Sequence, residues 1–182
     1  MSSKTNSFPF PVKEQAIDDL LRDVCIRKIN ENDYSEIIDM AWNIGVKAAI
    51  ELKRKHTLPY DFKKIATQEG LVIIDKDKDY IVGNTRYFSE FISGQSEITM
   101  YEKSITYWAE THRLEYSTAY NYILAHEFFH FLEWNHLGLT SRKYQVPMIK
   151  LGPWSFGKTG IKAMSEIGAN AFVHELFLGG KL

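Results

Sequence analysis

Apolar residues recur every three or four positions in four stretches of the chain, and this spacing predicts four main helices. Side chains at that spacing share one face of an α-helix, which then packs against the protein core. A shorter helix is expected over residues 62–68, because Asp61 can cap its start and Gly70 follows its end. The four main helices are expected over residues 12–27, 34–55, 117–137 and 161–178.

Three runs rich in β-branched and aromatic residues lie between the helices and predict strands. The last run partly alternates apolar and polar side chains, which is typical of a strand with one side in water. Residues 139–160 fit neither pattern, and because they contain several prolines and glycines we expect a long loop there. The predicted strands are residues 71–74, 80–88 and 96–102.

Together these elements predict an α+β fold for the chain of 182 residues. A small, mostly antiparallel three-stranded sheet is expected to pack on a helical core that includes the helices over residues 117–137 and 161–178. Hydrophobic residues at 45% and charged residues at 25% are ordinary values for a globular protein. We expect an N-terminal lead-in with a short helix over residues 1–30, followed by a single domain over residues 31–182.

Charge and cysteine content narrow the expected partners. The net charge of −1 gives no reason to expect binding to nucleic acid or to a membrane. Cys25 is the only cysteine, which excludes an internal disulfide and a cysteine-based zinc site. The N-terminus lacks the apolar segment of a signal peptide, and no run approaches the ~20 apolar residues of a membrane span. We therefore expect a cytoplasmic protein, whose oligomeric state the sequence leaves open.

The helix over residues 117–137 contains His126, Glu127 and His130 in the pattern H-E-x-x-H. Residues four apart lie ~40° from each other around an α-helix, so the two imidazoles can face one metal ion. Glu127 lies beside them, where its carboxylate can take a proton from a metal-bound water. On so apolar a helix these polar groups are costly without a metal or hydrogen-bonding partners. The motif predicts a zinc site, and a pair of ordinary hydrogen-bonded histidines is the alternative.

A catalytic zinc usually has three protein ligands, so a third residue is needed. Glu133 lies one turn beyond His130, too far along the helix to be a good ligand. His136 has the spacing of the third histidine in metzincins, but Glu133 stands where those proteins have the glycine that breaks the helix. A continuing helix would turn His136 away from the ligand face.

Glu166, on the helix over residues 161–178, is the remaining candidate for the third ligand. Its neighbours are mostly apolar, so its carboxylate needs a partner. Asn170 lies one turn further and can hydrogen-bond the second nitrogen of a ligand histidine. The residues alone leave an equal alternative, in which Glu166 is an ordinary first-turn glutamate stabilised by the helix dipole.

Two segments of the chain decide between these alternatives by their similarity to a known family. They are HEFFHFL, from His126, and EIGANAF, from Glu166. Together they resemble the ImmA/IrrE family of zinc metallopeptidases, in which E-x-x-A-N-x-F on a second helix supplies the third ligand. The resemblance implies a gluzincin-like site with His126, His130 and Glu166 as Zn²⁺ ligands and Glu127 as general base. It also implies a protein substrate, in this family often a transcriptional repressor.

The resemblance extends upstream to the order of a long helix, a short helix and three strands, and it covers roughly residues 35–178. The chain departs from the family in several places. Family members usually continue past the second ligand helix, and they often have alanine at the position of Val173. Residues 1–30 and 139–160 have no counterpart in the family pattern.

Hydrolysis of a peptide also needs a donor that stabilises the tetrahedral intermediate. Tyr144, Tyr122 and His174 are candidates, and the sequence leaves all three open. We expect the strand over residues 96–102 to form the edge of the cleft and to pair with an extended substrate. The alternative function is an inactive metal-binding module that uses the same cleft to hold a partner protein. Glu127 argues against it, because a binding protein needs no carboxylate beside the water.

Overall fold

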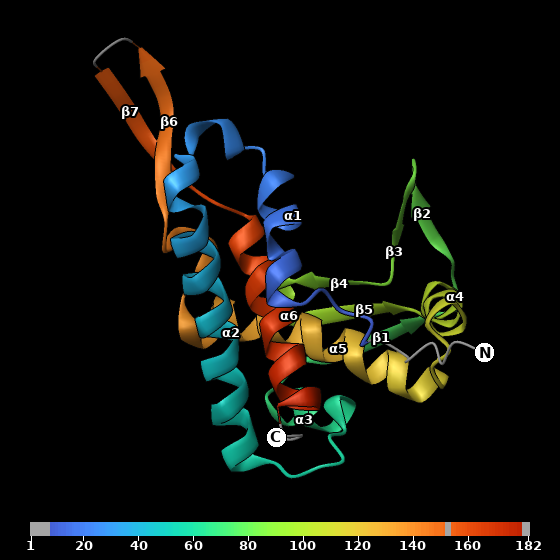
Figure 1. The fold of residues 1–182 in the computed structure, drawn as a ribbon. Coiled ribbons are helices and arrows are strands. Elements are labelled where there is room, and N and C mark those ends of the chain that lie inside the picture. Colours follow the sequence, from blue (N-terminus) through green and yellow to red (C-terminus); the bar gives the residue numbers. More distant parts are fainter. Residues whose placement is uncertain (1–7, 152–153, 180–182) are drawn as a thin grey trace, which may run out of the picture. The chain divides into compact units, whose positions relative to one another are not determined.

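The computed structural model describes residues 8–151 and 154–179 (Figure 1). Contacts group the described residues into two compact units, one with Phe8, Pro9 and residues 56–131 and the other with residues 10–55 and 132–179. Residues 10–30 group with residues 31–55 and 132–179 in the second unit. The predicted division into a lead-in over residues 1–30 and a single domain over residues 31–182 stays a prediction. The start of the predicted lead-in, before residue 8, lies outside the described residues.

The first unit contains a three-stranded sheet in the order β1-β5-β4. β5 (Glu97–Tyr101) is central: β1 (Val72–Lys76) pairs with it in parallel, and β4 (Ser89–Ile92) pairs with it antiparallel. Ile98 and Met100 of β5 are fully buried, so the central strand contributes to the core of this unit.

The predicted continuous strand over residues 80–88 is wrong. β2 (Tyr80–Val82) and β3 (Thr85–Tyr87) form a separate antiparallel hairpin. The chain turns at Gly83, whose φ of 59° lies in the left-handed region that glycine tolerates. Aromatic and β-branched residues lie on both sides of this turn, so strand propensity predicted one continuous strand. The separate strand β4 was not predicted.

α3 (Phe62–Gln68) precedes these strands in the sequence, and α4 (Glu102–His112) and α5 (Tyr116–Leu132) follow them. The prediction for α3 is confirmed, because the Asp61 side chain accepts a hydrogen bond from the Lys64 N–H at 3.0 Å. The sequence did not resolve α4. After α5 the chain continues as a π-helical turn over Glu133–Leu137 and leaves it at Gly138, so the predicted end of the helical stretch is confirmed.

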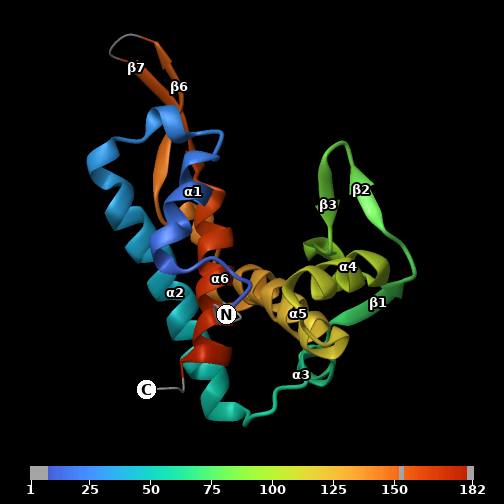
Figure 2. The same cartoon turned by 45° about the vertical axis from the view of Figure 1, so that its right-hand side comes forward.

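In the second unit, α2 (Tyr34–Lys55) and α6 (Ala163–Leu178) lie side by side (Figures 1 and 2). Both helices were predicted. Gly45 permits their close approach, because a Cβ at this position would lie 2.0 Å from the carbonyl oxygen of Gly168. A larger residue at position 45 would push the two helices apart.

The predicted helix over residues 12–27 is longer than the observed α1 (Ala16–Leu21). Asp23 explains the early end, because its side chain accepts from the Cys25 N–H at 2.7 Å and competes with helical hydrogen bonding. The second carboxylate oxygen of Asp23 accepts a hydrogen bond from the Ala163 N–H at 2.8 Å, which links the segment after α1 to the start of α6. Short 3-10 turns cover Lys13–Gln15, Ile26–Lys28, Glu31–Asp33, Ser93–Gln95 and Thr140–Arg142.

The long loop predicted over residues 139–160 is wrong as well. β6 (Gln145–Leu151) and β7 (Trp154–Gly160) form an antiparallel hairpin there. Pro147 and Gly157 argue against a strand in the middle of a sheet, but a two-stranded hairpin leaves one edge of each strand unpaired and accommodates them. The chain therefore mixes helices with small sheets, and three of its four described strand pairings are antiparallel. Within the described residues, no helix has the length and apolar character needed to cross a membrane.

Candidate metal centre

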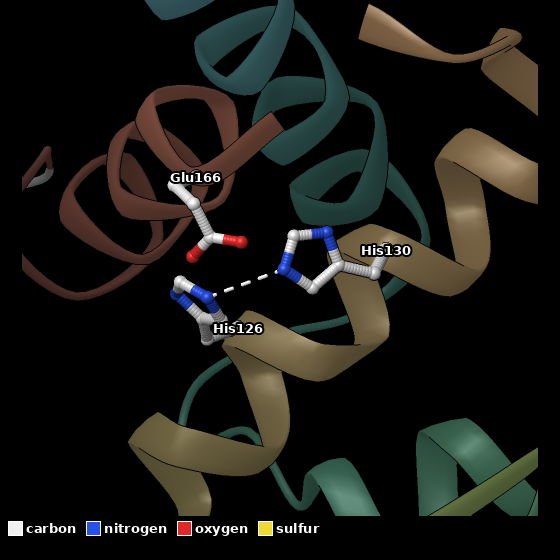
Figure 3. Close-up of side chains that lie close together, drawn as sticks. All are labelled: His126, His130 and Glu166. Atoms are coloured by element: carbon white, nitrogen blue, oxygen red, sulfur yellow. Dashed lines mark hydrogen bonds between the residues drawn. The ribbon is translucent and has the colours of Figure 1, made fainter. Parts of the chain in front are cut away.

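His126 and His130 face each other on one side of α5 (Figure 3). Their spacing of four residues places them one above the other on the helix surface. The two Nε2 atoms are 3.3 Å apart, and the rings are nearly perpendicular, with an interplanar angle of 77°. A pair of ring nitrogens at this distance suits either a hydrogen bond between neutral imidazoles or two ligands of one ion.

The aliphatic and phenylalanine residues of α5 around the two histidines are mostly buried. Ala125, Phe128 and Phe129 next to the motif are at most 1% exposed, whereas His126, Glu127 and His130 are half-buried. The apolar residues hold the helix in its unit, and they leave the motif as a partly accessible polar strip. This arrangement favours a catalytic or metal-binding site, because the buried part of the helix fixes the polar groups while they still reach solvent.

Glu127 has a partner that the sequence did not reveal. Ser89, the first residue of β4, donates its hydroxyl to Glu127 Oε1 at 2.7 Å. Ser89 lies far from Glu127 along the chain and belongs to no motif, so no local signal pointed to it. The hydrogen bond fixes the orientation of the carboxylate beside the two histidines.

Glu166 lies in the first turn of α6 and is exposed. Glu166 belongs to the second unit, whereas His126 and His130 belong to the first, so its role as the third ligand stays a prediction. Imidazole nitrogens and a carboxylate oxygen are a donor set that zinc commonly takes.

Asn170 lies one turn after Glu166 and is 7% exposed. Its amide Nδ2 donates to Asp19 Oδ2 of α1 at 3.4 Å. A hydrogen bond from Asn170 to a ligand histidine therefore stays a prediction. The contact with Asp19 gives the lead-in a link to the helix that carries Glu166.

A cavity of about 280 Å³ lies beside Glu166 within the second unit. It is bordered by the end of α1 and the start of α6, and its lining mixes acidic and basic side chains. The lining residues are Asp19, Arg22, Asp23, Val24, Lys162, Ala163 and Glu166.

The two rival third ligands differ from Glu166 in their surroundings. Glu133 is 2% exposed and accepts hydrogen bonds from the Thr140 N–H, at 2.9 Å, and from the Ser165 hydroxyl. It is thus a structural residue that joins the end of the helical stretch to the segments after it. His136 is exposed on the π-helical turn, and its role as the alternative third ligand stays a prediction.

The predicted transition-state donors all have interactions of their own. The Tyr144 hydroxyl donates to Asp33 Oδ2 at 2.7 Å, and this hydrogen bond raises the pKa of Tyr144 to about 12. His174 Nε2 lies 3.1 Å from the carbonyl oxygen of Phe10, and its ring packs against Trp42. Burial raises the pKa of Tyr122, whose ring packs against Phe8. The proposed catalytic role of each stays a prediction.

The strand that was expected to form the cleft edge does not have a free edge. β5, within the predicted range 96–102, is paired on both sides, so it cannot add a substrate strand. β4 is one of the two outer strands of the sheet, and it carries Ser89. Of β5 and β4, β4 is the one with an unpaired edge among the described residues. Pairing with a substrate stays a prediction.

Comparisons of this chain with family models, curated proteins and solved structures found no match. The resemblance to the ImmA/IrrE family thus rests on the sequence motifs alone and stays a prediction.

Proposed function

We propose that this protein is a zinc-dependent endopeptidase. The observation that carries the proposal is the pair of Nε2 atoms 3.3 Å apart on α5. Two nitrogens at ~2.05 Å from a zinc ion and at a tetrahedral angle are separated by ~3.3 Å. His126 and His130 thus have the separation that two ligands of one zinc ion require.

Glu166 is the third ligand in this proposal. When bound, zinc supplies a Lewis acid that lowers the pKa of a coordinated water towards ~7 and polarises the carbonyl of the scissile bond. Three protein ligands leave the open coordination position that catalytic zinc sites keep. In this proposal Asn170, one turn after Glu166, hydrogen-bonds the second nitrogen of a ligand histidine.

Glu127 is the general base. Because Oε1 accepts the hydrogen bond from Ser89, we assign proton transfer to Oε2. Oε2 takes a proton from the attacking water and later passes it to the amine of the leaving peptide. Ser89 holds the carboxylate in one orientation through both transfers, so less reorganisation is needed in the transition state.

The substrate is an extended protein segment that pairs with the outer edge of β4. Strand addition would place the backbone of the substrate alongside Ser89, the residue that holds Glu127. The cavity beside Glu166 has room for one substrate side chain. By resemblance, the substrate would be a regulatory protein such as a repressor. The proposal also includes action in the cytoplasm.

Metal analysis of the purified full chain tests the site before any substrate is known. We expect about one zinc per chain in the wild type, and a loss of most of the metal in His126→Ala and Glu166→Ala. His136→Ala is the matched control and should keep its zinc. Loss of zinc in His136→Ala alone would assign the third ligand to His136 and contradict the role of Glu166.

Cleavage separates the peptidase from the alternative, an inactive metal-binding module that holds a partner protein. The measurement is cleavage of fluorescein-labelled casein by wild type and by Glu127→Gln, each loaded with zinc. A peptidase loses cleavage in Glu127→Gln and keeps its metal. Cleavage that is unchanged in Glu127→Gln would contradict the proposed mechanism, and a zinc-loaded wild type that cleaves nothing would favour the binding module.

A further inference from the structure

The base of the β6–β7 hairpin is anchored in the core of the second unit. Val146, near the start of β6, is 3% exposed and belongs to the core of the second unit. The hairpin then projects beyond the helices of its own unit (Figures 1 and 2). A two-stranded hairpin without a third layer is marginally stable in water, so its outer half is suited to packing against something else.

The outer half of the hairpin carries an apolar face. Ile149 lies opposite Phe156 in the register, and Leu151 lies opposite Trp154, so these four positions share one face. Among the described side chains of this face, Ile149 and Phe156 are each 53% exposed and Trp154 is 69% exposed. Met148, on the opposite face, is also 54% exposed. Large apolar side chains gathered at a projecting tip mark a site of association.

Strand addition does not explain this surface well. Pro147 has no N–H to donate to an added strand, and proline is one of the residues that block edge pairing. The Lys28 Nζ also donates to the carbonyl oxygens of Pro147 and Met148, at 3.3 Å and 2.7 Å. Backbone groups along β6 are thus partly occupied, and recognition falls to the side chains.

Positive charge is concentrated around the same hairpin. Between Glu133 and Glu166 the sequence contains five basic residues and no acidic residue, although the whole chain has a net charge of −1. The near-neutral total, which led to the expectation of no membrane partner, therefore hides a strongly basic segment. Its basic residues are Arg142, Lys143, Lys150, Lys158 and Lys162.

We propose that the β6–β7 hairpin docks this protein on the surface of a bilayer that contains anionic lipids. Trp and Phe favour the polar–apolar interface of a bilayer, and each basic residue near an anionic leaflet adds to the affinity. Apolar insertion together with a basic cluster supplies the two signals that stable peripheral binding requires. At the depth of the headgroups, water and polar lipid groups can satisfy the free strand edges.

A lipid surface fits these residues better than nucleic acid does. Single-stranded nucleic acid uses aromatic rings for stacking and basic side chains for the phosphates. The aliphatic residues Met148 and Ile149, exposed beside the aromatic ones, would gain little from bases or phosphates, whereas they bury apolar area in a bilayer.

Co-sedimentation of the full chain with vesicles tests the proposal without any need for enzyme activity. The probes are phosphatidylcholine vesicles with and without about one-third phosphatidylglycerol, at about physiological ionic strength. We expect binding to the anionic vesicles and at least about tenfold weaker binding to the neutral ones. The double variant Trp154→Ser/Phe156→Ser should weaken binding by about tenfold or more. Lys143→Gln and Lys158→Gln should each weaken it by about fivefold.

Trp134→Ser is the matched control, because Trp134 is 52% exposed and lies outside the hairpin. This variant should bind as the wild type does, and circular dichroism checks that every variant is folded. Quenching of tryptophan fluorescence by brominated lipid should occur in the wild type and be much reduced in Trp154→Ser. Absence of wild-type binding, equal binding to neutral vesicles, or an equal loss in Trp134→Ser would each overturn the proposal. Binding of a single-stranded oligonucleotide that depends on Trp154, without vesicle binding, would assign the hairpin to nucleic acid instead.

Discussion

Glu127 and Glu133 are two carboxylates on one helical path, and each accepts a hydrogen bond from a serine hydroxyl. Ser89 donates to Glu127, and Ser165 donates to Glu133. Glu133 is 2% exposed and also accepts from the Thr140 N–H, whereas Glu127 is half-buried. The difference teaches that burial and the number of donors, not residue type or helix position, separate a structural carboxylate from one that is available for proton transfer.

Replacement of glutamate by glutamine should therefore lower activity at position 127 and stability at position 133. Glu127→Gln removes the proposed base and should lower kcat for labelled casein by about 10²–10⁴-fold, with little change in zinc content or in Tm. Casein cleavage, metal analysis and thermal unfolding are the three measurements. A large fall in Tm with unchanged kcat would make Glu127 a structural residue like Glu133.

Glu133→Gln should act on stability. The amide can accept at only one of its two positions, so either the Thr140 N–H or the Ser165 hydroxyl loses its acceptor. We expect a loss of about 2 kcal/mol, which corresponds to a fall of about 4–8 °C in Tm for a chain of this size. Thermal unfolding with and without zinc checks this value. An unchanged Tm together with lost zinc would place Glu133 at the metal instead.

Ser89→Ala should have an intermediate effect on activity. Without the hydroxyl, Glu127 loses the hydrogen bond that orients it, and kcat should fall by about tenfold while KM changes little. Ser89→Thr keeps a hydroxyl and should restore most of the activity, which a purely structural role would not predict. Equal activities in the alanine variant and the wild type would contradict the positioning role of Ser89.

The smallest effect is expected at a third hydroxyl–carboxylate pair, Tyr144 and Asp33, which is partly exposed. Tyr144→Phe should lower stability by about 1 kcal/mol at neutral pH. The hydrogen bond to Asp33 raises the pKa of Tyr144 to about 12 in the folded protein, above the value of about 10 expected in the unfolded chain. The contribution of Tyr144 is therefore fully present below pH ~10 and is lost as the pH rises towards ~12.

Chemical unfolding of the wild type and Tyr144→Phe between pH ~8 and ~11 measures this difference. The gap between the two proteins should narrow as the pH rises. A gap that stays constant would mean that the Asp33 contact does not favour the protonated tyrosine.

The sequence by itself determined the features that depend on nearby residues. The helical spacing placed His126 and His130 on one face of α5, and the Asp61 cap and the end at Gly138 were correctly assigned. Helical periodicity also identified α2 and α6. In each case the decisive interaction joins residues within one or two turns, so local chemistry is sufficient.

Only the tertiary structure decided features that depend on distant residues. The pairing of β5 on both sides moved the free edge of the sheet to β4, and Ser89 met Glu127 across a long stretch of chain. The strands β6 and β7, with their proline and glycines, were recognisable only from their pairing with each other. Strand pairing and side-chain contacts of this kind depend on which segments meet in space, and local propensity carries no information about that.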